Sequence, residues 1–534
     1  MRFDYIIIGS GSAGGMLANR LSEDASVSVL LLEAGQAEGH WTIRMPAATR
    51  NNFLGGPRNW CFSTEPEPWM DNRQIFQPRG KVVGGSSSLN GMVFVRGHRQ
   101  DFDSWRDSGA TGWGYEDVLP FFRSMETHAD GADDWRGDSG PINVAKTRSH
   151  HPMEQAFLAA VEAAGHGRAQ DYNGADQQGG TAFDVNVDKG ERSATAALIG
   201  RIRQRPNLTI LTHARVTGLQ IEGGRANGAT FICNGRVQTA HCDREVILSA
   251  GAIQSPQLLM LSGIGPAAQL RQHGIAVTVD LASVGEGLQD HLEVHVKHRS
   301  APGSSQNGLL RWDRMAAIGM QWFLTRRGAA ASTPSRVGGF LHTGDDAAYP
   351  DLQYHFWPYL LEGWSPPPGK DGYGFAVGPA QPKSRGWVRL ANADPMAAPL
   401  MRLNGLQSDY DREIFRRCIR ITREIAAQSA FDPVRGPEIS PGPDVTSDAD
   451  IDAWVRAHAN SAYHVCGTCR MGSDDAAVVT PDLKVRGVDG LRVIDAAIMP
   501  HVTNGNLNAP SLMIGEKGAA IILGKDPAFL PGKG

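Results

Sequence analysis

The sequence predicts an α/β protein in which a parallel-sheet domain is discontinuous and receives a second, inserted domain. Two observations support this fold class. A strand–turn–helix–strand pattern opens the chain, and strand-like apolar runs return at residues 245–252 and 491–496. The chain has 534 residues, whereas one domain usually has about 100–200. If both ends of the chain contribute strands to one sheet, the residues between them are numerous enough to form another domain.

The opening unit ends at Glu33. An apolar run at 5–8 precedes the turn GSGSAG at 9–14, a helix-like segment continues to residue 21, and a second apolar run occupies 27–32. This order is typical of a βαβ unit that binds a dinucleotide. A glycine turn without a ligand is the alternative, and the flanking strands together with Glu33 make it the less favoured one.

The residue types of this unit suit a bound pyrophosphate. Gly9 permits the tight turn, Gly11 lets the pyrophosphate approach the backbone, and Gly14 lets the helix pack on the sheet. The helix N-terminus presents free N–H groups and a partial positive charge to the phosphates. Glu33 is placed to accept hydrogen bonds from a ribose diol.

Further elements follow in chain order. Residues 208–211 and 218–221 are strand-like, and the run 245–252 enters a Gly-Ala turn that offers a second close backbone approach to a ligand. We expect a helix at 255–261 with Pro256 in its first turn, where a missing N–H is tolerated. Near the carboxyl end, a strand at 491–496 is followed by a long loop and a helix at 511–517.

One segment of the inserted region is ambiguous. Residues 309–324 have helical spacing, with Met315, Ile318, Met320, Trp322 and Phe323 among the apolar positions. Such a helix can lie on a membrane surface or pack into the core. Core packing is the favoured interpretation.

Composition limits the class of protein. Net charge is −4 and the pI is near 6.5, so we expect no nucleic-acid partner. No apolar run approaches the roughly 20 residues of a transmembrane helix, and the first strand leaves no room for a signal peptide. Six cysteines are few for this length, which fits a reducing compartment and predicts a cytoplasmic protein. A metal site at the CxxC of 466–469 is disfavoured, because no second pair accompanies it.

Three distant segments carry a family resemblance. They are RGKVVGGSSSLNG at 79–91, YHVCGTCRMG at 463–472, and the stretch 495–517 that contains NGNLNAP. Together with the opening turn and LSGIGP at 261–266, they resemble the glucose–methanol–choline (GMC) flavoprotein oxidoreductases, most closely the choline-dehydrogenase-like branch. The resemblance covers essentially the whole chain.

The resemblance implies a Rossmann-type FAD-binding domain and an inserted substrate domain built from an antiparallel sheet plus helices. The expected FAD-binding segments are 1–152, 193–298 and 462–534, and the expected substrate-binding segments are 153–192 and 299–461. The residues that match FAD contacts of the family are Gly9, Gly11, Ser12, Ala13, Gly14, Glu33, Ala34, Arg79, Gly84, Gly85, Asn90, Gly91, Met92, Val93, Val216, Ala250, Gly251, Asp495, Ala496, Asn506 and Asn508.

The resemblance also implies oxidation of a primary alcohol to an aldehyde, with further oxidation to the acid left open. His464 matches the histidine that takes the hydroxyl proton, and Asn508 matches the second active-site position, which holds the alcohol oxygen. These residue types suit the chemistry, because an imidazole accepts a proton near neutral pH while the flavin accepts the hydride.

Three more residues are candidates for the substrate pocket. His355 lies where some choline-oxidising members carry a pocket histidine, and a packed strand histidine is an equal alternative. Tyr463 suits either an aromatic wall or the core. Arg336 stands near the position of an acidic residue in choline dehydrogenases, and it either meets the substrate or faces solvent.

Two departures from the family pattern refine the expectation. Leu89 occupies the position where some members attach FAD through a histidine, which predicts a noncovalently held cofactor. Because Arg336 would repel a cation, a neutral or anionic alcohol is favoured over choline, and choline dehydrogenase or oxidase is the alternative. The electron acceptor stays open among oxygen, a quinone and an artificial dye.

Two other classes were weighed. A nicotinamide-dependent dehydrogenase would explain residues 1–33 but not the later segments. A flavin-binding protein without activity is disfavoured, because His464 and Asn508 are both intact.

Overall fold

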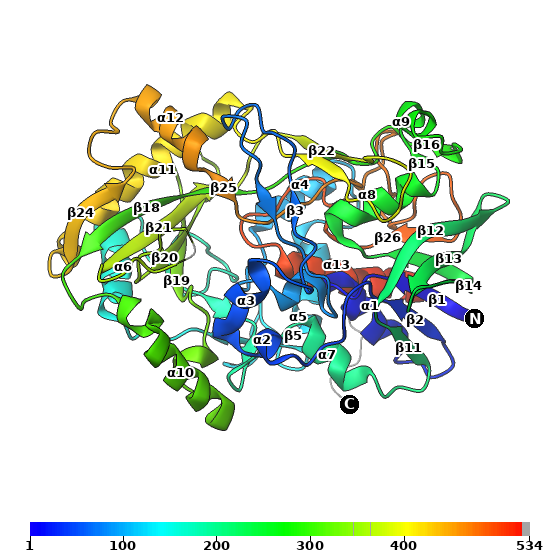
Figure 1. Ribbon diagram of the computed structural model, residues 1–534, viewed down its shortest axis with the longest axis horizontal. Coiled ribbons are helices and arrows are strands. Elements are labelled where there is room, and N and C mark those ends of the chain that lie inside the picture. Colours follow the sequence, from blue (N-terminus) through cyan, green and yellow to red (C-terminus); the bar gives the residue numbers. More distant parts are fainter. Residues whose placement is uncertain (345–346, 364, 526–534) are drawn as a thin grey trace.

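The computed structural model describes residues 1–344, 347–363 and 365–525 and contains two large sheets at opposite ends of an elongated molecule (Figure 1). The first sheet has parallel strands at its centre, as the opening βαβ pattern predicts. Its order is β11 (Leu208–Leu211), β2 (Val29–Leu32), β1 (Arg2–Ile8), β14 (Arg236–Leu248), β13 (Arg225–Cys233) and β12 (Ala214–Glu222), with β26 (Leu491–Val493) also paired to β14.

The long strand β14 joins three parts of the sequence in this sheet. Its first half pairs antiparallel with β13, and its last residues pair in parallel with β1 on one side and with β26 on the other. The strand that comes last in the chain therefore completes a sheet begun by the first. This confirms that the first sheet is assembled from distant segments.

Two helices from opposite ends of the chain pack together beneath this sheet. α1 (Ser12–Leu21) lies along α13 (Asn508–Leu523), which Figure 1 draws in blue and red. The guanidinium of Arg20 binds the carboxylate of Glu516 at 2.6 Å, and both side chains are buried. Such a pair is costly to break from one side only, because the remaining charge would be buried alone.

One helix differs from its expected start. α8 (Gly251–Leu261) begins four residues earlier than expected, so Pro256 lies inside it instead of in its first turn. Proline cannot donate to the carbonyl four residues before it. That carbonyl, of Ala252, accepts a hydrogen bond from the Thr468 hydroxyl at 2.7 Å. A loop of the family segment 463–472 thus satisfies the group that Pro256 leaves open.

The second sheet is antiparallel and lies in the other half of the molecule (Figure 1). Helices α6 (Pro152–Ala163) and α11 (Asp409–Ala427) pack against it. Its order is β24 (Arg435–Ser440), β18 (Leu292–Ser300), β21 (Gly372–Pro379), β20 (Leu352–Trp357), β19 (Val337–Leu341) and β7 (Gly179–Ala182), with β25 (Asn460–Ser461) paired to β18.

The first sheet is built from the segments expected to bind FAD, and the second mostly from the segments expected to bind substrate. β7 lies in the expected segment 153–192 and most other strands of the second sheet lie in 299–461. The expected junction at residue 298 falls inside β18, which pairs only with strands of the second sheet. We propose that this junction precedes Leu292.

The remaining elements connect and cover the two sheets. The other helices are α2 (Trp41–Arg44), α3 (Thr49–Phe53), α4 (Arg99–Asp107), α5 (Tyr115–Met125), α7 (Thr195–Ile202), α9 (Ala267–Gln272), α10 (Trp312–Thr325) and α12 (Asp448–His458). The short strands are β3 (Phe62–Ser63), β4 (Phe76–Gln77), β5 (Glu126–His128), β6 (Ile142–Lys146), β8 (Asp184–Val185), β9 (Val187–Asp188), β10 (Glu191–Arg192), β15 (Ile264–Gly265), β16 (Val279–Asp280), β17 (Glu286–Leu288), β22 (Gly386–Arg389) and β23 (Leu400–Arg402).

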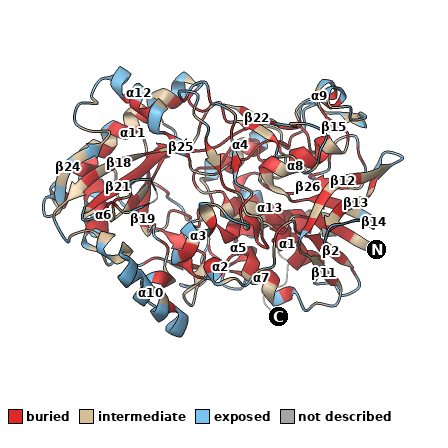
Figure 2. Ribbon diagram, in the orientation of Figure 1, coloured by how far each residue is buried: buried red, intermediate tan, exposed pale blue. Residues whose placement is uncertain are grey.

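The favoured interpretation of residues 309–324 was wrong. α10 forms, but Trp322 is its only buried residue, and Figure 2 shows the helix mostly in the colour of exposed residues. Trp322 and the half-buried Ile318 pack against Met45 and Ala330. The helix therefore has one narrow inner face, and its other apolar side chains face outward.

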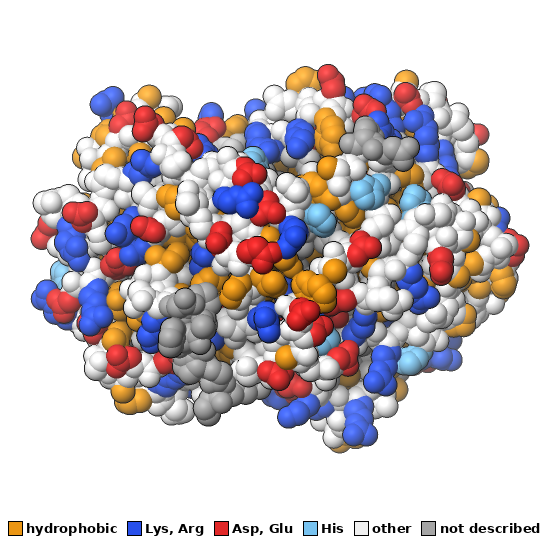
Figure 3. Space-filling view, turned by 180° about the vertical axis from the view of Figure 1, so that it is seen from behind, with side chains coloured by type: hydrophobic (Ala, Val, Ile, Leu, Met, Phe, Trp, Pro, Cys, Tyr) orange, Lys and Arg blue, Asp and Glu red, His pale blue; other side chains and the backbone are white. Residues whose placement is uncertain are grey.

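The surface gives no sign of a nucleic-acid site on the face seen in Figure 3, where acidic and basic side chains are intermixed. Within the described residues, no helix is both long enough and apolar enough to cross a membrane.

Candidate active site

A cavity of about 700 Å³ runs between the two halves of the molecule. Its wall contains residues of the glycine turn and the 79–91 loop as well as residues of the second sheet. The expected site residues in the wall are Gly9, Gly11, Ser12, Ala13, Glu33, Ala34, Arg79, Gly85, Asn90, Gly91, Met92, Val93, Val216, Ala250, Gly251, Arg336, Tyr463, His464, Asp495, Ala496, Asn506 and Asn508. Gly14, Gly84 and His355 lie outside it.

The glycine turn forms one end of the cavity. Gly9 has φ +99°, which favours glycine, and a Cβ on Gly14 would overlap the carbonyl oxygen of Gly9. A Cβ on Gly11 would meet nothing within 4 Å. Gly14 thus serves helix packing, whereas Gly11 leaves open space at the N-terminus of α1, where a phosphate would lie.

Glu33 is buried beside this turn at the end of β2. Its Oε2 accepts hydrogen bonds from the Ser10 amide and hydroxyl, and its Oε1 accepts one from the Gly35 amide at 2.7 Å. A carboxylate has about four acceptor sites, so one remains for a ribose hydroxyl. Burial raises the pKa of Glu33, and these hydrogen bonds oppose that shift.

The 79–91 loop connects the nucleotide end of the cavity to the histidine end. A Cβ on Gly85 would lie 2.8 Å from the Gly11 Cα, so the loop crosses close to the glycine turn. Arg79 donates to the Tyr463 carbonyl at 2.8 Å, while its buried Nε has no partner within the described part of the chain. This unpaired donor in the cavity wall fits an acceptor atom of a bound group.

Asp495 holds the opposite wall in place. Its Oδ2 accepts from the Gly251 amide at 2.8 Å and from the Ser255 hydroxyl, and its Oδ1 accepts from the Ala497 amide. Most of its acceptor capacity is therefore used within the chain. Asp495 ties the start of α8 to the carboxyl-terminal segment, and both border the cavity.

These features fit FAD. The turn and Glu33 suit its dinucleotide part, and the loop carrying Arg79 extends the same cavity toward His464. Leu89 also lines the cavity and packs with Ile43, Val82 and Ala196, which keeps an apolar side chain at the position where some family members attach the flavin.

His464 lies in the cavity wall within a chain of side-chain hydrogen bonds. Its Nδ1 is 3.0 Å from Nδ1 of His291, and its Nε2 is 3.1 Å from Nδ2 of Asn506. Asp290 accepts a hydrogen bond from the His464 amide at 2.7 Å and so holds the backbone of the loop. Burial lowers the pKa of His464 well below its ordinary value, and His291, His355 and Arg79 lower it further.

The partners of His291 assign the protons in this chain. Nε2 of His291 is 2.9 Å from the carbonyl oxygen of Ala380, which only accepts, so Nε2 carries the proton. Burial lowers the pKa of His291 to about 4, so this ring is neutral and its Nδ1 accepts. His464 must then donate from Nδ1. Its unprotonated Nε2 accepts the hydrogen bond from the Asn506 amide, and it can take a substrate proton once an alcohol hydroxyl replaces that contact.

The structure brings Asn506, not Asn508, to the histidine. The Oδ1 of Asn506 accepts from Gln353 at 3.0 Å, which directs its amide nitrogen toward His464. Asn508 instead accepts from the Ser12 hydroxyl at 2.9 Å and donates to Asn186 at 3.1 Å. The chain enters α13 between the two asparagines. Asn508 is therefore bound to Ser12 and Asn186, and Asn506 is the asparagine whose amide contacts His464.

The three expected pocket residues lie in different surroundings. Tyr463 lines the cavity and packs edge-on against Phe53, with ring centroids 4.8 Å apart. His355 is outside the cavity wall, packed against Phe183 and beside Asn506, and burial lowers its pKa. Arg336 lines the cavity, yet its guanidinium binds the fully buried carboxylate of Glu154 at 2.8 Å.

Two residues of the cavity region were missed by sequence reasoning. His291 and Glu293 come from the stretch Asp290-His291-Leu292-Glu293, where β18 begins. The alternation of apolar and polar residues along β18, LEVHVKHRS, was the available signal. Nothing in the sequence indicated that they meet the loop of His464, more than 170 residues later.

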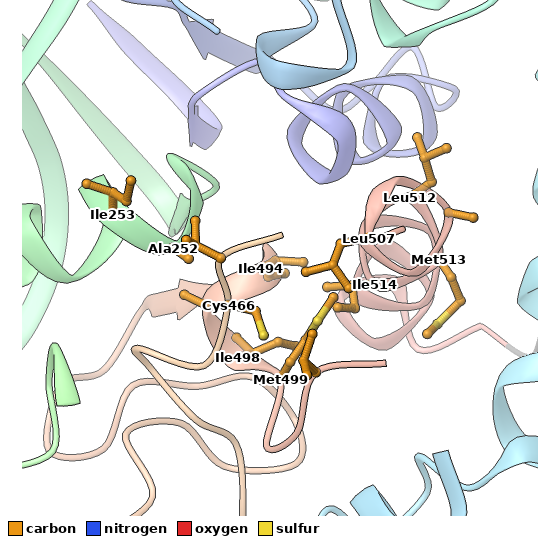
Figure 4. Packing of buried hydrophobic residues seen from close by; sticks show 14 of the residues in the cluster. Ala252, Ile253, Cys466, Ile494, Ile498, Met499, Leu507, Leu512, Met513 and Ile514 are labelled. Atoms are coloured by element: carbon orange, nitrogen blue, oxygen red, sulfur yellow. The ribbon is translucent and has the colours of Figure 1, made fainter. Parts of the chain in front are cut away.

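The two cysteines of the CxxC belong to the core. Cys466 and Cys469 are fully buried, and burial raises the pKa of both thiols. Figure 4 shows Cys466 among Ile494, Ile498 and Met499. Among the described residues, no group of three or more His, Cys, Asp or Glu side chains could hold a metal ion.

A dinucleotide-binding sheet, a long cavity and a neutral histidine in its wall suit an FAD-dependent oxidoreductase of CH–OH donors. Family models of the GMC oxidoreductases match residues 3–293 and 382–515. The chain belongs to the GMC oxidoreductase family.

The relatives span nearly the full chain. An oxygen-dependent choline dehydrogenase of Sinorhizobium fredii (strain NBRC 101917 / NGR234) is 47% identical over 532 residues, covering 99% of this chain and 96% of the relative. One of Rhizobium meliloti (strain 1021) is 45% identical over 531 residues, with the same shares covered. These relatives confirm the similarity to the choline-dehydrogenase-like branch.

Solved structures agree in fold. Pyridoxine 4-oxidase from Mesorbium loti superposes with a TM-score of 0.88 at 31% identity, covering 97% of this chain and 98% of that one. A variant of formate oxidase from Aspergillus oryzae RIB40 gives 0.91 at 28% identity, covering 98% of each chain. The cofactor is FAD, and the nicotinamide alternative fails because the likeness extends far beyond the opening βαβ unit.

Proposed function

We propose that this enzyme oxidises a primary alcohol that carries a quaternary ammonium group, as choline does. The observation that carries the proposal is a carboxylate, Glu293, in the wall of the cavity that contains His464. The names of the relatives support choline over the neutral or anionic alcohol that the sequence favoured.

Glu293 is suited to attract a cation. Its Oε1 is 3.1 Å from Nε2 of His295. Burial raises the pKa of this carboxyl, but the hydrogen bond from His295 leads the opposing contributions, and the net shift is downward. The group is therefore ionised at neutral pH. Trp357, Tyr359 and Tyr463 line the same cavity, and aromatic faces attract ammonium groups by cation–π interaction.

In the folded chain, the charge of Arg336 no longer disfavours choline. Two of its guanidinium nitrogens contact Glu154, at 2.9 Å and 2.8 Å, and that carboxylate has no exposed surface. A paired charge repels a substrate cation far less than an isolated one, because the two fields largely cancel beyond the pair.

The side chains of His464, Asn506 and His291 have different roles in the oxidation of the alcohol. When bound, FAD supplies the hydride acceptor. The bound alcohol would replace the contact between the Asn506 amide and Nε2 of His464. Nε2 would then accept the hydroxyl proton, and the Asn506 amide would donate to the alcohol oxygen. Nδ1–H of His464 stays bound to His291, which fixes the ring in the orientation and tautomer that the base requires.

The two asparagines are expected to separate in a matched pair of variants. Asn506→Ala should slow flavin reduction by the alcohol about 100-fold, the order seen when one oriented donor to a developing oxyanion is removed, while FAD is retained. Asn508→Ala should weaken FAD retention and leave reduction of the FAD-loaded fraction nearly unchanged. Stopped-flow reduction under nitrogen and flavin content after gel filtration measure both. The reverse pattern would restore Asn508 to the catalytic position.

A panel of alcohols tests the proposed substrate. Anaerobic flavin reduction is compared for choline, for 3,3-dimethylbutan-1-ol, in which carbon replaces the ammonium nitrogen, and for an anionic primary alcohol. Choline should have the largest second-order rate constant, because only choline gains from Glu293. Equal or faster reduction by the neutral analogue would reject the proposal. Admitting oxygen afterwards reports whether it serves as the acceptor.

Three finer properties stay predictions. They are the noncovalent hold on FAD, the identity of the electron acceptor, and a cytoplasmic location. Leu89 supports the first, since its side chain has no nucleophilic atom.

A further inference from the structure

Arg192, the last residue of β10, is a buried cation whose partners are all neutral. It is 4% exposed, and burial lowers its pKa to about 9, so the guanidinium is charged at neutral pH. Within the described residues it forms no ion pair. Its acceptors are the carbonyl oxygens of Ile43, Ser87 and Asn90, the side-chain oxygen of Asn90 and the hydroxyl of Thr49. An isolated buried charge is costly, so the site is complementary to a bound anion.

The other deeply buried arginines of the described chain differ from Arg192 in this respect. Each of them binds a carboxylate: Arg20 binds Glu516, Arg96 binds Glu126, Arg136 binds Asp184, and Arg492 binds Glu245. Burial of an arginine in this protein is thus normally accompanied by a compensating negative charge. At Arg192 the chain leaves that charge to be supplied from elsewhere.

Arg192 also fixes the side chain of Asn90. Nη1 of Arg192 donates to the carbonyl oxygen of Asn90 at 2.9 Å and to its Oδ1 at 2.6 Å. The Met92 amide donates to the same Oδ1 at 3.1 Å. Two donors assign the oxygen to that side of the amide and turn Nδ2 away. Asn90 lines the cavity, and its Nδ2 has no hydrogen-bond partner in the described part of the chain, so it can donate to a bound group.

The turn at 86–91, which carries Asn90, leads from the glycine turn to the other half of the molecule. Just before it, a Cβ on Gly85 would lie 2.8 Å from the Gly11 Cα. At its end, the Gly91 carbonyl accepts a hydrogen bond from the Thr333 hydroxyl at 2.7 Å, and Thr333 lies in a segment expected to bind substrate. The glycine turn suits the phosphates of FAD. We therefore expect Asn90 to border the part of the cavity where the flavin meets the alcohol.

We propose that Arg192 is a positioning residue that favours the reduced flavin, because it places a positive charge beside the 86–91 turn and directs Nδ2 of Asn90 toward an acceptor atom of the flavin ring. A hydride carries two electrons and one proton, so its transfer leaves one additional negative charge on the flavin, while the hydroxyl proton of the alcohol goes to His464. Attraction between this negative charge and Arg192 stabilises the reduced form. The inference does not depend on which alcohol is oxidised.

The midpoint potential of the flavin tests the proposal, measured by anaerobic titration of the FAD-loaded protein against a reference dye. Arg192→Met removes the charge and should lower the two-electron potential by about 30 mV, a tenfold smaller ratio of reduced to oxidised flavin. This is the order expected for a unit charge roughly 10 Å away at an effective dielectric constant of about 20. Arg192→Lys keeps the charge and should stay within about 10 mV of the wild type, roughly a twofold change in that ratio.

Asn90→Asp neutralises the charge without removing the arginine. Aspartate has the shape of asparagine, so its Oδ1 can still accept from Arg192 and from the Met92 amide. Its carboxylate pairs with Arg192 and replaces the Nδ2 donor by an acceptor. The potential should fall at least as far as in Arg192→Met. Because the hydrogen bonds of the turn are kept, this variant decides the question even if Arg192→Met fails to fold.

Arg205→Met is the matched control. Arg205 is half-buried and also donates to neutral groups, namely the carbonyl and side-chain oxygens of Asn19 and the hydroxyl of Ser22. It does not line the cavity, and none of these partners does. Its variant should have the midpoint potential of the wild type.

Three results would overturn the proposal. The potential of FAD-loaded Arg192→Met could equal that of the wild type, or Asn90→Asp could leave the potential unchanged. Arg192→Lys and Arg192→Met could also lower the potential equally, which would assign Arg192 to hydrogen bonding without an effect of its charge on the flavin.

Discussion

Replacing His464 with glutamine should slow alcohol-dependent flavin reduction by about 10²- to 10⁴-fold, the usual contribution of a positioned general base. FAD should stay bound, because the side-chain partners of His464 are His291 and Asn506 and it makes no hydrogen bond to the glycine turn or Glu33. Glutamine keeps a polar side chain of similar length but has no basic nitrogen. Rapid-mixing spectroscopy under nitrogen measures the rate, and the flavin absorbance of the purified variant measures retention. An unchanged rate would contradict the proposed base.

The pH profile of the same reaction gives a second readout. His464 works as the neutral base, and its pKa is lowered, so the wild-type rate should persist as pH falls through 6.5 and be lost only below that. A loss near pH 6 would have another origin, since burial raises the pKa of Asp290, which holds the His464 amide, to about 6. Only the His464 limb should vanish in His464→Gln, whereas the Asp290 limb should remain.

Glu293→Gln should lower the second-order rate constant for choline by about 100-fold, as expected when one partner of a largely buried charge pair is removed. The neutral analogue 3,3-dimethylbutan-1-ol should change by less than about threefold, because it gains little from the carboxylate. The two substrates thus separate loss of charge from loss of shape. Anaerobic flavin reduction with each substrate provides both numbers.

Glu286→Gln is the matched control for this variant. Glu286 is half-exposed on β17, pairs with Arg389 and does not line the cavity. It should leave both substrates unaffected. If Glu293→Gln slows choline and the neutral analogue equally, Glu293 supports the architecture of the site and does not attract the ammonium group.

Much of the fold could be predicted from local patterns. β1, α1 and β2 follow from alternating apolar runs around a glycine turn, and their prediction was confirmed. α10 shows the limit of such patterns. Its apolar spacing predicts a helix, but the spacing is the same for a core helix and for one that packs only through a narrow face. Whether such a helix lies in the core depends on the elements packed around it. On α10, Ile318 and Trp322 are the residues that pack against other elements in the described chain.

The two asparagines show the same limit at the site. Asn506 and Asn508 are two positions apart in one motif, and either could face the histidine. The entry into α13 separates them, and Gln353 on β20 orients the amide of Asn506 while Ser12 on α1 binds that of Asn508. Both partners are distant in sequence, so the motif alone could not distinguish the asparagines.

The sequence by itself determined the dinucleotide-binding unit, the family, the cofactor and His464 as the candidate base, because each depends on short motifs whose own residues are close together in the chain. Tertiary structure decided the proton on His464, the partner of Arg336 and the place of Glu293 in the cavity. These depend on hydrogen bonds and ion pairs between residues more than 150 positions apart. Burial then sets their charge, since desolvation shifts a pKa only where the folded chain excludes water.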